Sequence, residues 1–207
     1  MHKKEFLVRG KKLGEAEKVL IMVHGRGANA EDIVSLSGSL DVKDFTIIAP
    51  RATGNTWYPY SFLSPPAVNE PWLSSAIAML GELLNDIAET GVANKNIFLL
   101  GFSQGACLTL EFAARNAKRY GGIAAFTGGL IGDKIYAENY SGNFDLTPVF
   151  LGSSDPDPHI PVERVTASAN IFRNMNAAVT EKIYNNMGHS INEDEIQTVN
   201  KIIFNGA

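Results

Sequence analysis

The chain of 207 residues has few of the features that would tie it to an oxidising compartment, a metal or a polyanion. Its single cysteine, Cys107, excludes an internal disulfide, so folding does not depend on oxidation. The four histidines lack the short paired spacings that metal ligands favour, and we expect neither a metal nor a cofactor. The net charge of −4, with no basic run beyond lysine pairs, argues against nucleic acid as a partner.

Long hydrophobic runs are missing as well. No apolar stretch approaches the length that spans a bilayer, and the N-terminal apolar segment "FLV" is far too short for a signal peptide. We therefore expect a cytoplasmic protein without stable membrane insertion. The length and the hydrophobic content of 45% predict one globular domain over residues 1–207.

The sequence does contain short, continuous apolar runs at intervals. Runs of this kind suit strands of a parallel sheet that is covered on both faces. The runs are 18–23, 45–49, 96–100, 122–126 and 148–152. Residues 5–10 and 181–186 are less uniform, which predicts strands near the sheet edges, and "GKKLGE" predicts a hairpin that joins 5–10 to 18–23.

Helical patterns alternate with these runs. Apolar residues recur at helical spacing in 74–89, in the segment after Pro161, and after an N-cap pair formed by Asn192 and Glu195. Alternation of strand and helix predicts an α/β fold, with a mostly parallel, twisted sheet of about seven strands and helices on both faces.

Chemically active side chains follow the predicted strands. "HGRG" follows 18–23, "GFSQG" follows 96–100, "SSDPDPHIP" follows 148–152 and "MGHS" follows 181–186. Since parallel strands end at one edge of a sheet, we expect these segments to meet there. "GFSQG" matches a nucleophile elbow, in which a serine is held on a tight turn between strand and helix.

Ser103 needs a base and a carboxylate to act as a nucleophile. His189 follows the last predicted strand and is the expected base, while Asp155 and Asp157 are acids that spacing alone does not separate. The chain order of serine, acid and histidine is the order found in one family of α/β enzymes. His159 and His24 are weaker candidates for the base, and we expect His24 to hydrogen-bond locally.

Glycines and backbone N–H groups complete this prediction. Gly101 and Gly105 would let strand and helix approach closely. The N–H groups of Arg26 and Gln104 are the expected oxyanion hole. Aromatic residues of the irregular segment 59–72 and its N-terminal flank are candidates for an acyl pocket or for ordinary loop packing; they are Trp57, Tyr58 and Phe62.

Two other functions fit parts of the sequence. "GRGANA" satisfies the G-x-G-x-x-G/A fingerprint of dinucleotide-binding oxidoreductases, and Arg51 would suit a 2′-phosphate. That function leaves Ser103, Asp157 and His189 unexplained, and the next strand lacks the usual acid. A non-catalytic binding protein on the same fold is the second alternative, although none of the three reactive side chains is missing.

The combination of several motifs resembles the phospholipase/carboxylesterase family of α/β-hydrolases, relatives of the acyl-protein thioesterases. The motifs are "HGRGANAEDIVSLS", "WYPYSF", "GFSQGA", "DPDPHIP" and "GHS", and the similarity runs from about residue 18 to the C-terminus. The resemblance implies an α/β-hydrolase fold and selects Asp157, in its D-P-x-[VI]-P element, as the acid. Ser154, where the family pattern has glycine, and Arg26, where many relatives have an apolar residue, depart from that pattern.

The resemblance further implies a serine hydrolase that cleaves carboxylic esters of small to medium acyl groups through an acyl-enzyme. Thioesters and lysophospholipids are open as alternative substrates. Family members are often monomers or homodimers, and the sequence does not choose between these states.

Overall fold

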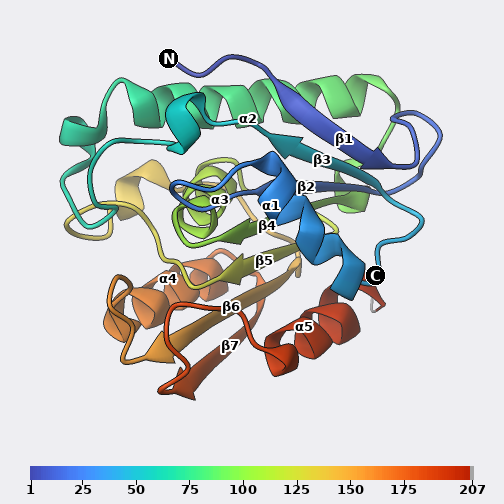
Figure 1. The fold of residues 1–207 in the computed structure, drawn as a ribbon. Coiled ribbons are helices and arrows are strands. Elements are labelled where there is room, and N and C mark those ends of the chain that lie inside the picture. The colour runs from blue at the N-terminus through green and yellow to red at the C-terminus, as the bar shows by residue number, and fades with distance from the viewer. Residues whose placement is uncertain (206–207) are drawn as a thin grey trace.

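A sheet of seven strands forms the centre of the computed structural model, which describes residues 1–205 (Figure 1). The order across the sheet is β1-β3-β2-β4-β5-β6-β7, and every neighbouring pair is parallel except β1 with β3. The strands are β1 (Phe6–Gly10), β2 (Val19–Val23), β3 (Thr46–Pro50), β4 (Ile97–Phe102), β5 (Gly122–Phe126), β6 (Pro148–Asp155) and β7 (Ala178–Asn185). The predicted fold class, an α/β-hydrolase fold with a mostly parallel sheet, is confirmed.

Helices cover both faces of this sheet. The helices are α1 (Ala30–Ser35), α2 (Trp72–Glu89), α3 (Gln104–Arg115), α4 (Val162–Asn174) and α5 (Glu193–Val199). Short 3₁₀ turns lie at Leu36–Ser39, Thr53–Asn55, Pro66–Asn69, Asn94–Asn96 and Ala137–Asn139, and a π turn lies at Asn200–Phe204. Helices α2, α3 and α4 cover one face, and α1 and α5 cover the other (Figure 1). Within residues 1–205, no helix is long and apolar enough to cross a bilayer.

The central strands are apolar on both faces because each face has its own core. All five residues of β2 are buried, with Val19 and Val23 in the cluster under α2 and α3, and Leu20 in the cluster under α1 and α5. Full burial of each such side chain stabilises the fold by about 1.5–3 kcal/mol. This double burial explains the unbroken apolar runs of the sequence.

The predicted hairpin between residues 5–10 and 18–23 is wrong. Strand β1 pairs antiparallel with β3 instead, so that Leu7 faces Ala49. Both hydrogen-bonding edges of β2 are used by its parallel neighbours β3 and β4, which leaves no place for a hairpin partner. The prediction that 5–10 and 181–186 lie near the sheet edges is confirmed, since β1 and β7 are the outer strands.

Candidate active site

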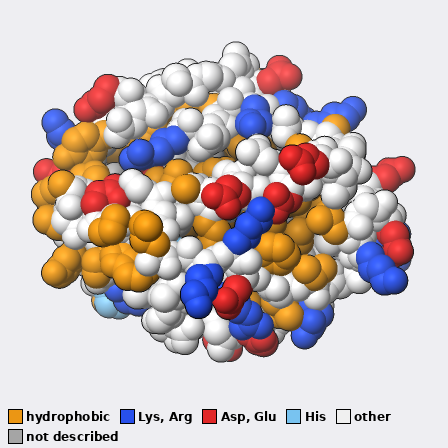
Figure 2. Space-filling view, turned by 90° about the horizontal axis from the view of Figure 1, so that it is seen from above, with side chains coloured by type: hydrophobic (Ala, Val, Ile, Leu, Met, Phe, Trp, Pro, Cys, Tyr) orange, Lys and Arg blue, Asp and Glu red, His pale blue; other side chains and the backbone are white. Residues whose placement is uncertain are grey.

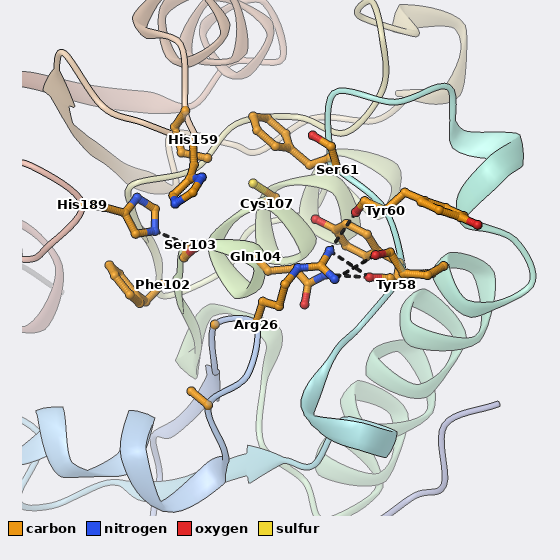
Figure 3. Close-up of a pocket in the computed structure, with 15 residues that line it drawn as sticks. Arg26, Tyr58, Tyr60, Ser61, Phe102, Ser103, Gln104, Cys107, His159 and His189 are labelled. Carbon is orange, nitrogen blue, oxygen red and sulfur yellow. Dashed lines mark hydrogen bonds between the residues drawn. The ribbon is translucent and has the colours of Figure 1, made fainter.

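Segments that follow the carboxyl ends of β2, β4, β6 and β7 meet around one pocket. Gly25 and Arg26 follow β2, Ser103 follows β4, and His189 follows β7; all of them line this pocket. His159, from the segment after β6, lies beside them (Figure 3). The sequence-based expectation that these segments share one edge of the sheet therefore agrees with the structure.

Ser103 lies on a strained turn between β4 and α3. Its φ of 54° and ψ of −121° are unfavourable for a residue with a side chain, and its N–H donates to Phe126 O at 3.0 Å. Two glycines permit the turn, because a Cβ atom on Gly105 would lie 2.1 Å from Val23 O, and one on Gly101 would lie 2.4 Å from Gly105 O. Strand and helix thus approach as closely as the motif predicted.

Three side chains from different loops form a continuous chain of hydrogen bonds. His189 Nε2 lies 2.8 Å from Ser103 Oγ (Figure 3). On the other side of the ring, Nδ1 lies 3.0 Å from Asp157 Oδ2 and 3.2 Å from Oδ1. Nδ1–H donates a hydrogen bond to the carboxylate, which leaves Nε2 without a proton and able to accept a hydrogen bond from the serine hydroxyl.

The environment of Asp157 keeps its carboxylate ionised. Burial acts to raise the pKa of Asp157, but the backbone N–H groups of His159 and Ile160, at 2.7 and 2.9 Å from Oδ1, and the His189 ring outweigh it. The net effect lowers the pKa below its ordinary value of 3.8. Asp155, the other acid in the motif, is exposed at the end of β6 and does not contact the imidazole in the described residues.

Ser154 connects the loop of the acid to the loop of the histidine. Its hydroxyl oxygen accepts the Gly188 N–H at 2.9 Å, and its O–H donates to Pro156 O at 3.0 Å. A glycine at this position, as in the family pattern, could not form either bond. This departure in the sequence therefore has a structural role beside the site.

The two remaining candidate histidines have other surroundings. His24 is buried; the Ala52 N–H donates to its Nε2 at 3.2 Å, so Nδ1 carries the proton and donates to Gly25 O at 2.8 Å. Burial lowers the pKa of His24, so the ring stays neutral and shapes the loop locally, as expected. His159 is exposed, and its ring packs edge-on against the His189 ring with centroids 5.0 Å apart.

Arg26 and Gln104 contribute both backbone and side chain to the site. Within residues 1–205, neither backbone N–H donates to a protein acceptor, and Gln104 opens α3, where N–H groups have no partner inside the helix. The buried Gln104 amide oxygen accepts the Trp57 N–H at 3.0 Å, and its NH₂ group donates to Tyr58 O at 2.9 Å. The side chain thus anchors the segment after β3 to the Ser103 turn.

The Arg26 guanidinium holds this same segment. It donates to Tyr58 O at 3.0 Å, to Pro59 O at 2.9 Å and to Tyr60 O at 2.7 Å, and it lies over the Tyr58 ring, 5.9 Å from the centroid (Figure 3). These contacts join residues more than 30 positions apart, so no local pattern in the sequence signals them. Sequence reasoning missed this clamp.

The pocket has a volume of about 480 Å³. Tyr58 and Phe62 line it, as the sequence suggested, together with Phe102, Cys107 and Ile160. Its exposed lining residues are of mixed polarity: Pro59 and Tyr60 are beside Arg26, Ser61 and His159. Hydrophobic side chains gather on the left of Figure 2, the end of the molecule where the segment between β3 and α2 lies.

Trp57 differs from the expectation, because it does not line this pocket. Its side chain is fully buried, its ring packs against those of His24 and His2, and its Nε1–H donates to His24 O at 2.8 Å. The indole N–H needs an acceptor when buried, and the loop carbonyl supplies it. Trp57 therefore packs against the loop that carries Arg26, on the side away from the pocket.

The contacts of the glycine-rich loop do not favour a dinucleotide site. A Cβ atom on Gly25 would lie in ordinary contact with Phe102 O, at 3.4 Å, and with Ser103 Cβ, at 3.5 Å, so this loop packs against the serine turn. Arg51, which would meet a 2′-phosphate, forms a bidentate ion pair with Glu31.

Comparison with known proteins identifies relatives. A family model described as Phospholipase/Carboxylesterase matches residues 4–205. Acyl-protein thioesterase 1 of Kluyveromyces lactis is 30% identical over 142 residues, which cover 67% of this chain and 62% of that protein. The matches to the first three curated relatives span 62%, 51% and 49% of their own lengths.

Solved structures agree with this match. The crystal structure of a phospholipase/carboxylesterase from Dyadobacter fermentans is 49% identical and superposes with a TM-score of 0.97, covering 98% of this chain and 97% of that one. Esterase PE8 is 23% identical with a TM-score of 0.81, covering 96% and 97% of the two chains, a likeness that shows the fold.

Proposed function

The chain belongs to the phospholipase/carboxylesterase family, and from this premise we propose that it is a serine hydrolase acting on carboxylic esters. The observation that carries the proposal is the hydrogen-bonded series from Ser103 Oγ through His189 to Asp157, at 2.8 and 3.0 Å, beside a pocket of about 480 Å³. An oxidoreductase or a non-catalytic binding protein would have no use for this series. The reaction proceeds through an acyl-enzyme.

In the first half of the reaction, His189 Nε2 takes the proton of Ser103 Oγ while the oxygen attacks the ester carbonyl carbon. The electron pair of the carbonyl π bond moves to its oxygen, and the backbone N–H groups of Arg26 and Gln104 stabilise that oxyanion. Asp157 stabilises the imidazolium that forms. The tetrahedral intermediate then collapses, the bond to the leaving alcohol breaks, and His189 gives its proton to the departing oxygen.

In the second half, water replaces the alcohol. His189 takes a proton from water as the water oxygen attacks the acyl carbon on Ser103, and a second oxyanion forms in the same position. Collapse of this intermediate breaks the bond to Ser103 Oγ, which recovers its proton from His189. The products are the carboxylic acid and the free enzyme.

The substrate class follows from the pocket and the relatives. A volume of about 480 Å³ suits small to medium acyl groups, and Tyr58, Phe62 and Ile160 give the pocket an apolar lining. Because a relative is named acyl-protein thioesterase 1, thioesters are the second class to test. Lysophospholipids are the third.

A fluorophosphonate probe tests the proposal directly. We expect it to label Ser103 in the wild type, as found by peptide mapping, and to leave Ser103→Ala unlabelled and unable to hydrolyse p-nitrophenyl esters. Ser141→Ala, which removes an exposed serine elsewhere, is the matched control and should be labelled like the wild type. Labelling of another residue, or full activity in Ser103→Ala, would reject the assignment.

Three expectations from the sequence accompany this proposal. We propose that the chain folds as one domain, because both core clusters share the same sheet. The cytoplasmic location and the choice between monomer and homodimer stay predictions.

A further inference from the structure

The inner wall of the pocket contains a phenol without a hydrogen-bond partner. The Tyr58 side chain is 1% exposed and lines the pocket, and its hydroxyl forms no hydrogen bond with any residue of the described range 1–205. Its polar neighbour is the Cys107 thiol, a weak acceptor that already receives the Gly129 N–H at 3.5 Å. Figure 3 shows the Tyr58 ring directed toward Cys107.

Buried hydroxyl groups are normally paired, because an unpaired donor loses its bond to water and gains nothing in return. Burial also raises the pKa of Tyr58 well above its ordinary value of 10.0, so the group remains a neutral donor at physiological pH. The site therefore offers one O–H donor, and the neighbouring Cys107 thiol is only a weak acceptor for it.

The position of Tyr58 is fixed by its backbone. Its carbonyl oxygen accepts hydrogen bonds from Arg26 Nη2 at 3.0 Å, Gln104 Nε2 at 2.9 Å and Thr56 Oγ1 at 3.1 Å. These bonds tie the residue to both sides of the nucleophile turn. The bonds hold the backbone of Tyr58, and burial confines its ring, so an acceptor must come to the phenol.

An acyl group bound at Ser103 would share this pocket with the Tyr58 side chain. Ser103 and Tyr58 line the same pocket, and Cys107, the neighbour of the phenol, lies one helical turn after Ser103, with its N–H 3.0 Å from Ser103 O. One turn of helix is about 5.4 Å long, which corresponds to roughly four to six bonds of an acyl chain. Among the residues described, no acidic side chain lines the pocket to compete for the donor.

We infer that Tyr58 is a specificity-determining residue whose hydroxyl donates a hydrogen bond to an oxygen atom near the far end of the acyl group. The inference rests on the proposed function. The preferred substrates are then esters of oxygenated medium-length acids, with a neutral ketone, hydroxyl or ether oxygen about four to six bonds from the ester carbonyl carbon. A saturated chain of equal length offers the phenol no acceptor. A chain that ends in a carboxylate must give up its hydration and gains one hydrogen bond from a neutral donor in return. Both acyl groups should therefore bind less well than the oxygenated one.

Two esters of equal length test the inference. p-Nitrophenyl 5-oxohexanoate and p-nitrophenyl hexanoate share a leaving group, and their alkaline hydrolysis rates correct for intrinsic reactivity. We expect the wild type to favour the oxo ester by about tenfold in kcat/KM, the effect of one hydrogen bond made to a buried donor. In Tyr58→Phe, the two corrected kcat/KM values should become equal. Because this variant removes an unpaired hydroxyl, its Tm should equal or exceed that of the wild type.

Tyr120→Phe is the matched control. Tyr120 is fully buried like Tyr58, but its hydroxyl donates to Asn116 O at 2.8 Å, and it does not line the pocket. Its loss should lower Tm and leave the ester preference at the wild-type value. Equal corrected rates for the two esters in the wild type, or an unchanged preference in Tyr58→Phe, would overturn the inference alone. Hydrolysis of neither ester, with no probe label on Ser103, would overturn the proposed function and this inference together.

Discussion

Replacing Gly105 by alanine probes a close approach between two backbones, where α3 passes the end of β2. A Cβ atom at this position would lie 2.1 Å from Val23 O and 2.5 Å from His24 O. Real Cβ contacts are not shorter than 3.0 Å, so the helix and strand must separate by about 0.9 Å, the difference between 3.0 and 2.1 Å. Strand β2 has β3 and β4 hydrogen-bonded on its two sides, so the shift falls on the helix.

The expected loss of stability follows from two opposing effects. Overpacking against backbone atoms costs up to about 3 kcal/mol, because no side-chain rotation relieves it. Alanine in place of glycine within a helix recovers about 1 kcal/mol. The net loss of about 2 kcal/mol corresponds to a fall in Tm of about 4–8 °C for a chain of this size. Because Gln104 and Ser103 move with the helix, we expect kcat/KM for an ester to fall by about 100-fold.

Thermal unfolding followed by circular dichroism, together with ester hydrolysis, measures both effects. Gly81→Ala is the matched control, since Gly81 lies inside α2 and a Cβ there would meet only Phe112, at 3.9 Å. Its Tm should rise by about 1–4 °C with hydrolysis unchanged. If Gly105→Ala melted as high as Gly81→Ala, the close approach would not constrain the fold and the reasoning would fail.

Three further changes test individual groups. Asp157→Asn should lower kcat by about 10³- to 10⁴-fold, because the amide cannot stabilise the imidazolium; Asp155→Asn should keep its activity in the same assay, and equal losses would contradict the choice of acid. Burial raises the pKa of Glu195 from 4.5 to about 7, so the folded chain holds this proton more tightly and its free energy of unfolding falls as pH rises through that interval. Glu195→Gln should therefore gain Tm relative to the wild type between pH 5 and pH 8, and a pH-independent difference would refute this. Arg26→Met should raise KM for esters more than it lowers kcat, because the loop carbonyls lose their clamp, while Arg9→Met, at an exposed residue whose guanidinium donates to Val8 O, should change neither value.

The sheet could be predicted from the sequence because its strands are buried on both faces. The run 122–126 becomes β5 without a change of boundary, since every residue in it packs into a core. The pairing of β1 could not be predicted, because a short turn sequence such as "GKKLGE" permits a hairpin but does not reveal that β2 has both edges occupied. The occupancy of both edges of β2 depends on β3 and β4, which lie far from this turn in the sequence.

Some features of the candidate site could likewise be predicted from the sequence, and others could not. The meeting of Ser103 and His189 could be predicted because each follows a recognisable strand, and the family pattern selected Asp157, which contacts His189. The sequence could not show which way the Trp57 side chain points, since an aromatic residue in a loop can face a pocket or a core. Long-range contacts such as the Arg26 clamp leave no local pattern at all.

The strained backbone angles at Ser103 lower the stability of the fold at the residue whose hydroxyl the proposed reaction uses. A φ of 54° with a ψ of −121° disfavours every L-residue with a side chain, but glycine adopts such angles freely. A chain selected only for resistance to heat would therefore replace this serine by glycine and become more stable by about 1–2 kcal/mol, with no hydroxyl left to attack a substrate. The strained residue is thus the one that the proposed reaction needs.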